Sequence, residues 1–431
     1  MTDAVSGSTG GNAFFGKGIV GGPGGDAHAS INLTGFTDVA AQAQATGGNG
    51  GSVQDGGNAG HGGAATLGAV LATSNGGGNV DVEGLAIGGS GGRGSAFAHT
   101  SAASGGDGTS VSLTDIVDGS TTGGLLLSQG ARGGSGGAAT GDGTVGVAGS
   151  ALSSLSRSKS SSSLLVRMEA FGGNGGDLTS ASGTSGNGAT AISISSAIND
   201  AGSAPAKASA TGGFGGSGQA GASGGAGGQA NATAFAATTG GFVATAIAEV
   251  RGGSGQQGNL HGSALAHAQS NGVSGTASTL AQSGDGSEAA GGIVRQITTS
   301  ATAPVTSTSI TESRAAVSEP TADRPSATGL QSAAFATALP TANEVQAALI
   351  DNPNVNRNLG VGGISDVLGL VVLGGAYSNN GSGTSLTYTS RADFDLDMTP
   401  LLGNSHDLLV GLLDTTTLGL GFDTLNFQIG P

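Results

Sequence analysis

The amino-acid sequence predicts a mainly β protein: a right-handed parallel β-solenoid built from Gly-punctuated repeats of about 40 residues. The first of three supporting observations is a Gly-rich string that returns at a nearly constant interval. The second is a regular alternation of apolar and polar residues before each string. The third is composition, because 89 of the 431 residues are Gly, aromatic residues make up 3% and charged residues 10%. Together they indicate a fold with many glycine-dependent positions and small side chains in a thin core.

The repeated string is Gly-Gly-x-Gly. Its first residue recurs at Gly47, Gly88, Gly133, Gly172, Gly212 and Gly252. The successive intervals of 41, 45, 39, 40 and 40 residues are typical of a stack of similar units. We expect the glycines to permit positive φ where each strand ends and the chain turns.

The residues before each string alternate with a period of two. Counted backwards from the first Gly, the even positions are apolar or Gly in every repeat except at Gln129, and every charge falls on an odd position. This alternation indicates a β-strand with one buried face. Because a slip of one residue would turn every charge inward, the six copies support one shared register. In the first copy we therefore expect Ala41, Ala43 and Ala45 to be buried.

Two other folds share parts of this pattern. An array of β-hairpins in a sandwich would show the same alternation. A bundle of polyglycine-type helices would need Gly at every third residue, and the alternating strands interrupt that period.

We expect three regions along the chain. Residues 1–292 form the Gly/Ala-rich β-repeat array. Residues 293–340, rich in Ser, Thr and Pro, are interpreted as an extended linker, with irregular strands that continue the array as the alternative. Residues 341–431 form a C-terminal α+β or β-sandwich region with one short helix, which begins at a capping box from Thr341 to Glu344.

Charge and composition exclude several classes. The formal net charge is −15, and the 13 basic residues are scattered, which argues against a nucleic-acid partner. Without Cys there is no disulfide or thiolate metal site. The sequence shows no apolar run long enough for a transmembrane helix, and its first residues do not resemble a secretory signal. We expect export by another signal, or that the chain is an internal piece of a longer protein.

Several motifs resemble catalytic loops only in their glycines. The segment 11–18, GNAFFGKG, has phosphate-loop spacing but lacks Ser or Thr after Lys17. The segments 88–92 and 133–137, both GGSGG, match the pattern of a nucleophile elbow. That elbow needs a strand that leads into a helix, together with His and acidic partners, whereas here the Ser lies within a Gly run. We interpret them as products of the Gly content.

The candidate metal ligands are all aspartates. The string GGNGGDLTS at 172–180 matches the start of a calcium-roll repeat, which makes Asp177 a weak candidate because Thr179 replaces the large apolar residue expected there. Asp393, Asp395 and Asp397 alternate along one predicted strand, so their carboxylates would share a face and attract a calcium ion. The alternative for these three is a solvated strand face. We expect no cofactor other than calcium.

The Gly-punctuated array resembles bacterial secreted and surface β-solenoid proteins such as adhesins and autotransporter passengers. The strings GGNGG and GGAGG also resemble Gly-rich repeats of mycobacterial surface proteins, and residues 406–429 resemble late segments of large secreted repeat proteins. The resemblance implies a non-enzymatic extracellular or cell-surface protein with a structural or adhesive role, and an extracellular surface, matrix or glycan as partner. The alternatives are a glycan- or ice-binding solenoid and, less favoured, a polysaccharide-degrading solenoid enzyme, which would need clustered carboxylates.

Overall fold

The structure is a computed structural model that describes most of the array and several later segments. It covers residues 2–6, 19–96 and 102–282 apart from 240, 258 and 273, then 297–303, 310–316, 330–338, 342–349, 369–376, 387–393 and 426. The chain divides into two compact units. One comprises residues 1–338 and 371–395, and the other 339–370 and 396–431.

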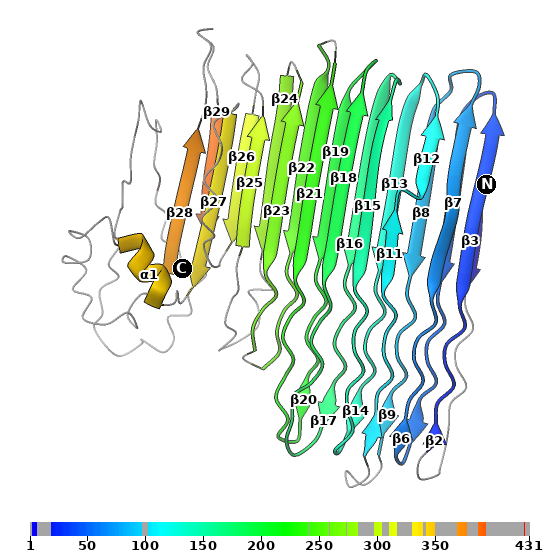
Figure 1. The fold of residues 1–431 in the computed structure, drawn as a ribbon, viewed down its shortest axis with the longest axis vertical. Helices are drawn as coiled ribbons and strands as arrows, with labels where there is room; N and C mark the ends of the chain where they lie inside the picture. The colour runs from blue at the N-terminus through cyan, green and yellow to red at the C-terminus, as the bar shows by residue number, and fades with distance from the viewer. Residues whose placement is uncertain are drawn as a thin grey trace. The chain divides into compact units, whose positions relative to one another are not determined.

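The larger unit is a β-solenoid. Each full coil contains a strand, a short turn, a second strand and a Gly-rich excursion (Figure 1). The second strands form a ten-stranded sheet, here called sheet A, in which every described pair is parallel. In spatial order it consists of β1 (Thr2–Ser6), β4 (Val39–Thr46), β8 (Val80–Ile87), β13 (Gly124–Arg132), β16 (Ser163–Phe171), β19 (Ala204–Thr211), β22 (Val243–Arg251), β24 (Ser274–Gln282), β26 (Ile310–Ala316) and β29 (Thr387–Asp393).

The first strands of the coils form an eight-stranded sheet, sheet B, and a separate three-stranded sheet. Sheet B contains, in order, β11 (Val111–Thr114), β15 (Ala151–Lys159), β18 (Ala191–Asn199), β21 (Ala230–Thr238), β23 (Ala264–Asn271), β25 (Ile297–Ala303), β27 (Leu330–Ala338) and β28 (Gly369–Ala376). The three-stranded sheet contains β12 (Val117–Ser120), β7 (Ala65–Ser74) and β3 (Ala27–Gly35). In sheet B the pairs from β11 to β25 are parallel, whereas β25 and β27 are antiparallel.

The predicted alternation and the β-solenoid are confirmed. Ala41, Ala43 and Ala45 are buried, and so are the residues at the even positions of the five later copies. Side chains from both sheets form one hydrophobic cluster composed mainly of Ala and Val. Small side chains let the two sheets approach closely, so the core is thin and one methyl group is a large fraction of its depth.

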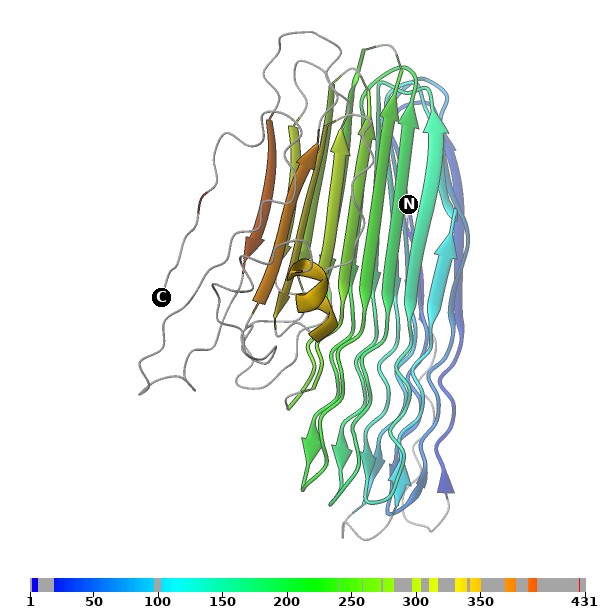
Figure 2. The same ribbon diagram turned by 60° about the vertical axis from the view of Figure 1, so that its left-hand side comes forward.

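The Gly-rich excursions form two further layers below the strands in Figure 1, and the rotated view in Figure 2 shows the same layers. At their far end lie strands of only two residues. These are β2 (Ile19–Val20), β5 (Val53–Gln54), β6 (Gly57–Asn58), β9 (Gly94–Ser95), β10 (Ala103–Ser104), β14 (Ala139–Thr140), β17 (Leu178–Thr179) and β20 (Gly218–Gln219). Between the long strands and these short ones, the backbone hydrogen bonds differ from those of a β-sheet ladder.

Backbone hydrogen bonds in these layers follow a period of three. In one outgoing segment, the N–H of Gly172 donates to the carbonyl of Thr211 in the next coil of the same layer, at 2.9 Å. The N–H of Gly173 donates across to Gly149 in the other layer, at 2.9 Å, and Gly175 donates again within its own layer to Phe214, at 2.8 Å. Three residues per turn is the period of a polyproline-II-type helix. The strand array and the polyglycine-type bundle are therefore not alternatives, because one coil contains both.

The glycines of the repeated string have a different role from the one the sequence predicts. Among the described residues the positive-φ glycines are Gly56, Gly57, Gly77, Gly141, Gly183, Gly221 and Gly241, and none belongs to a Gly-Gly-x-Gly string. Instead, a Cβ at Gly173 would lie 2.1 Å from the carbonyl oxygen of Gly134, and one at Gly175 would lie 2.0 Å from that of Gly186. The prediction that the string glycines permit positive φ is therefore wrong. Glycine is needed there because the backbones of neighbouring coils pack too closely for a Cβ.

Polar residues at the third position of each string satisfy the remaining backbone N–H groups. The side chains of Asn49, Ser90, Ser135 and Asn174 each accept the N–H of the equivalent residue one coil later, at 2.9–3.3 Å, and the last of these donors is Phe214. Because these side chains provide acceptors for backbone N–H groups, the ladder explains why Asn and Ser recur there.

One interruption in the strands explains the polar residue in the buried register. Asp115, with φ of 54°, and Ile116 separate β11 from β12. The buried amide of Gln129 accepts the N–H of Ile116 at 3.1 Å and donates to the carbonyls of Leu113 and Ser154. Gln129 thus supplies the hydrogen bonds that the interrupted strand lacks.

The range predicted to be a linker contains three strands. β25, β26 and β27 pair with neighbours in the two sheets. This agrees with the alternative interpretation of residues 293–340, in which strands continue the array. The second unit contains helix α1 (Ala342–Leu349), which begins one residue after Thr341. Across the described part of the chain, no helix has the length and apolarity needed to span a membrane.

Candidate functional site

Of the predicted calcium ligands, Asp177 and Asp393 lie in different parts of the described structure. Asp177 lies in the Gly-rich layer, where its carboxylate accepts the N–H of Ser217 at 2.7 Å, one coil further on. Asp393 is the last residue of β29 and is in register with Ala316. Its side chain, together with Asp395 and Asp397, lies outside the described residues. Within the described part, no group of three or more His, Asp or Glu side chains is placed to hold a metal ion.

The catalytic-looking motifs are part of the ladder or lie outside the described residues. The hydroxyls of Ser90 and Ser135, the central residues of the two GGSGG segments, accept backbone N–H groups of the next coil at 3.2 and 3.3 Å. Their role is structural in this geometry. The phosphate-loop-like segment 11–18 lies outside the described residues.

The outward face of sheet A carries several charged side chains, and some of them are paired. The Lys207 ammonium is 2.8 Å from the Glu249 carboxylate on the next strand, and the Arg132 guanidinium lies 4.7 Å from the centroid of the Phe171 ring. Arg167 and Glu169 form an ion pair along β16. Such exposed pairs stabilise a protein only modestly, but they set the electrostatic character of this face.

In sheet B the outward side chains of β15, β18, β21 and β23 carry no formal charge. We call this surface the neutral face, and define it as every second residue from 152 to 158, 192 to 198, 231 to 237 and 265 to 271. These positions hold Ser, Thr, Asn, Gln, Ala, Ile, Leu, Phe and one His. On a chain with net charge −15, a surface that spans four strands without an acidic or basic side chain is a distinctive feature.

On β18 the usual placement of apolar and polar residues is reversed. Ser193 and Ser195 face the core and are fully buried, while Ile192 and Ile194 face outward. Ile194 retains 38% of its surface in contact with solvent, and Leu265 on β23 retains 43%. The thin core admits serine because it is scarcely larger than alanine. The outward isoleucines are not required by that core, and a partner that covered them would remove their apolar surface from water.

His267 keeps the neutral face uncharged near neutral pH. Its ring lies at an outward position on β23, in register with Thr233 on one side and Ser300 on the other. Partial burial lowers the pKa of His267 below its ordinary value of 6.5 because a desolvated imidazolium is disfavoured. The imidazole is therefore neutral at pH 7.

Sequence inspection alone does not single out this face, although a signal for it exists. The segments 191–199, 230–238 and 264–271 contain no Asp, Glu, Lys or Arg. What the sequence lacks is the knowledge that these three segments are neighbours in one sheet, with the same parity facing outward.

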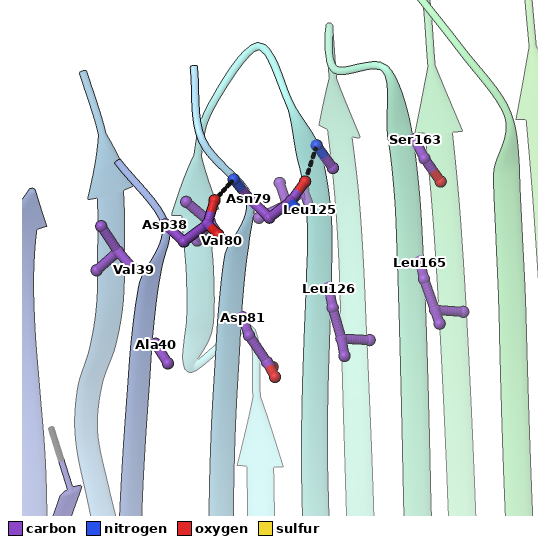
Figure 3. A pocket seen from close by; sticks show the side chains of 11 residues that line it. Asp38, Val39, Ala40, Asn79, Val80, Asp81, Leu125, Leu126, Ser163 and Leu165 are labelled. Atoms are coloured by element: carbon purple, nitrogen blue, oxygen red, sulfur yellow. Dashed lines mark hydrogen bonds between the residues drawn. The ribbon is translucent and has the colours of Figure 1, made fainter. Parts of the chain in front are cut away.

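A second surface feature lies on sheet A. Near the turns that precede β4, β8, β13 and β16 there is a depression of about 440 Å³ with a mainly apolar lining (Figure 3). Leu126 and Leu165 line it together with the carboxylates of Asp38 and Asp81.

Comparison with known proteins yields no match to any family model, curated protein or solved structure. The two surfaces must therefore be interpreted from their own chemistry.

Proposed function

We propose that this chain is a non-enzymatic, extracellular or cell-surface repeat protein with a structural and adhesive role, and that the neutral face is its adhesive surface. The observation that supports the proposal best is the lack of charge on that face. Removing a charged group from water costs far more free energy than removing a hydroxyl, an amide or an alkyl group. A neutral face can therefore be dehydrated against a partner at low cost, whereas the charged face of sheet A cannot.

The partner that fits this chemistry is a neutral, hydroxyl-rich polymer such as an extracellular glycan. Side chains in register on neighbouring strands lie about 4.8 Å apart, so hydroxyls and amides form regular columns. These groups both donate and accept hydrogen bonds, as sugar hydroxyls do. Ile192, Ile194 and Leu265 add apolar contacts that suit the C–H faces of sugar rings.

The residues of the neutral face favour ice binding less than glycan binding. A rank of identical Thr side chains would match a repeating lattice, but the outward column Leu152, Ile192, Asn231 and Leu265 is mixed. Thr233 is the one threonine on the neutral face as defined above.

The stacked architecture supports the structural part of the proposal. Parallel ladders and the Gly-layer bonds connect each coil to the next without interruption from β13 to β24 of sheet A. Because each coil mainly contacts its neighbours, such a stack acts as a semi-rigid spacer that presents one face repeatedly.

The test measures retention of the chain on immobilised neutral polysaccharides, with dextran, mannan and galactan as probes and heparin as the charged comparison. We expect retention on at least one neutral polymer in 1 M NaCl, since screening weakens contacts between exposed charges but leaves neutral contacts in place. The double variant Ile194→Asp, Leu265→Asp should reduce that retention at least tenfold. The matched control variant, Thr211→Asp on the outer face of sheet A, should be retained on the polymer as strongly as the wild type.

Three outcomes would count against the proposal. Retention on heparin alone, or retention unaffected by the double variant, would remove the neutral face as the adhesive surface. Release of reducing ends from a soluble glycan panel, at a rate proportional to protein concentration, would establish an enzyme instead.

A further inference from the structure

The depression on sheet A arises where one strand lacks a side chain. Gly124 at the start of β13 is in register with Ser163, and its N–H donates to the Asn79 side chain at 3.1 Å. Because glycine has no Cβ, the outer surface is hollow between Asn79 and Ser163, as Figure 3 shows.

The row of side chains below this hollow closes it on one side. Ala40, Asp81, Leu126 and Leu165 are successive register partners across β4, β8, β13 and β16. The small Ala40 leaves the Asp81 carboxylate accessible, and the two leucines supply an apolar wall. The result is a concave surface that combines an apolar part with a few polar groups, as small-molecule sites do.

The polar groups of the depression are mainly hydrogen-bond acceptors, and two of them are negatively charged. The Asp38 carboxylate is held in place because its Oδ1 accepts the N–H of Asn79 at 2.7 Å. Asp81 projects from β8, and two residues further along the same strand lies Glu83. The lining includes neither Lys nor Arg. An occupant of matching chemistry therefore carries a positive charge, hydrogen-bond donors and an alkyl part.

We propose that the depression binds a small aliphatic ammonium compound. The ammonium group donates hydrogen bonds to the carboxylate of Asp81, which shares a row with Leu126, and the alkyl chain packs against Leu126 and Leu165. The Asp38 carboxylate, two residues away along the strand direction, adds electrostatic attraction without direct contact. An ammonium group has three donors and no acceptor, which complements an ionised carboxylate. Since both carboxylates are exposed, solvent screens the attraction and the affinity is on the order of 1 mM.

The experiment titrates n-hexylammonium into the intact chain and follows saturation-transfer NMR signals of the ligand. Hexanol and hexanoate, which share the alkyl chain but are neutral or anionic, serve as ligand controls. We expect hexylammonium to bind at least tenfold more tightly than either control. Raising NaCl from 20 to 500 mM should weaken its binding several-fold because the charges are exposed.

Matched variants separate the charge from the shape. Asp38→Asn keeps the oxygen that accepts the Asn79 N–H, and Asp81→Asn preserves the volume at that position, so both should remain folded. Asp81→Asn should weaken hexylammonium binding at least fivefold, and Asp38→Asn should weaken it less, because its carboxylate attracts the ammonium without contacting it. Asp200→Asn, an exposed carboxylate that does not line the depression, should leave the binding unchanged.

The apolar part of the site has its own variant. Leu165→Ser should weaken hexylammonium binding but leave that of methylammonium unaltered, since methylammonium lacks the chain that contacts the leucines. Equal binding of hexanoate and hexylammonium, or hexylammonium binding that is the same in Asp81→Asn as in the wild type, would overturn the proposal. Because the readout concerns sheet A, its failure would leave the adhesive role of the neutral face untouched.

Discussion

The strand layers and the Gly-rich layers of one coil obey different packing rules. In the strand layers, successive coils contact one another through backbone ladders, and alternate side chains fill the thin gap between the sheets, where Ala, Val, Leu and Met are all accommodated. In the Gly-rich layers, a Cβ at most of the string glycines would lie about 2 Å from a carbonyl oxygen of a neighbouring segment. A side chain as small as a methyl group therefore fills most of the core in the strand layers. The Gly-rich layers leave no room for that methyl group.

In this fold a high glycine content reflects close backbone packing and not flexibility. The strands need side chains because their stabilisation comes from burying apolar surface. The Gly-rich layers bury hardly any side-chain surface, and their stabilisation comes from backbone hydrogen bonds in two directions. An added methyl group should therefore lower the free energy of unfolding more in the Gly-rich layers than on the outer face of a strand.

The largest expected effect tests this rule directly. Gly175→Ala would place a methyl group 2.0 Å from the Gly186 carbonyl oxygen, so the two layers would have to separate. We expect the free energy of unfolding, measured by urea denaturation, to fall by at least about 3 kcal/mol, at the upper end of overpacking effects.

The matched control for this prediction is Gly130→Ala on the outer face of β13. There the nearest atom to a new Cβ is the end of the flexible Leu85 side chain, at 2.9 Å. This variant should change the free energy of unfolding by less than about 1 kcal/mol. Equal stability of the two variants would contradict the inference that close backbone packing excludes a Cβ from the Gly-rich layers but not from the outer strand face.

An intermediate effect is expected from the ladder of third-position residues. Asn174→Ala removes the acceptor for the Phe214 N–H, and we expect a loss of about 1 kcal/mol in the same denaturation measurement, because the site is exposed and water replaces part of the bond. Asn174→Asp retains an acceptor oxygen and should restore most of the stability. A loss as large as that of Gly175→Ala would show that side chains, and not the glycines, dominate these layers.

The smallest effect concerns the neutral face, where varied side chains are tolerated. The pKa of His267 is lowered in the folded state, so the unfolded chain binds the proton more tightly. The contribution of His267 to the free energy of unfolding should be constant above about pH 6.5 and decrease as the pH falls through the window between 6.5 and the lowered pKa. We expect this decrease to be smaller than the effects above, because the imidazole is only partly buried, and urea denaturation at a series of pH values measures it. His267→Gln should abolish this component, and a dependence that persists in that variant would assign it to other groups.

Much of the fold could be predicted from the residues. The period of about 40 residues and the alternation before each string correctly identified the buried residues Ala41, Ala43 and Ala45 and the β-solenoid class. The exception in that register, Gln129, had no explanation in the sequence. Its partners at Leu113, Ile116 and Ser154 come from neighbouring strands and meet it only after the coils stack.

The candidate surfaces were harder to predict. The calcium ligands Asp393, Asp395 and Asp397 were chosen because i, i+2 spacing is visible along one strand, and that site remains a prediction. The neutral face and the depression are assembled from residues about 40 positions apart, such as Asp81, Leu126 and Leu165. No local spacing relates such residues.

The sequence by itself determined the repeat, the strand register and the small size of the core, because these follow from local periodicity and from which side chains are present. Only the folded coils reveal which of the two sheets presents charges outward, why the strings need glycine, and how polar third-position residues are used. The physical reason is that each of these depends on the distance between neighbouring coils. That distance is set by backbone hydrogen bonds between segments that are remote in the chain.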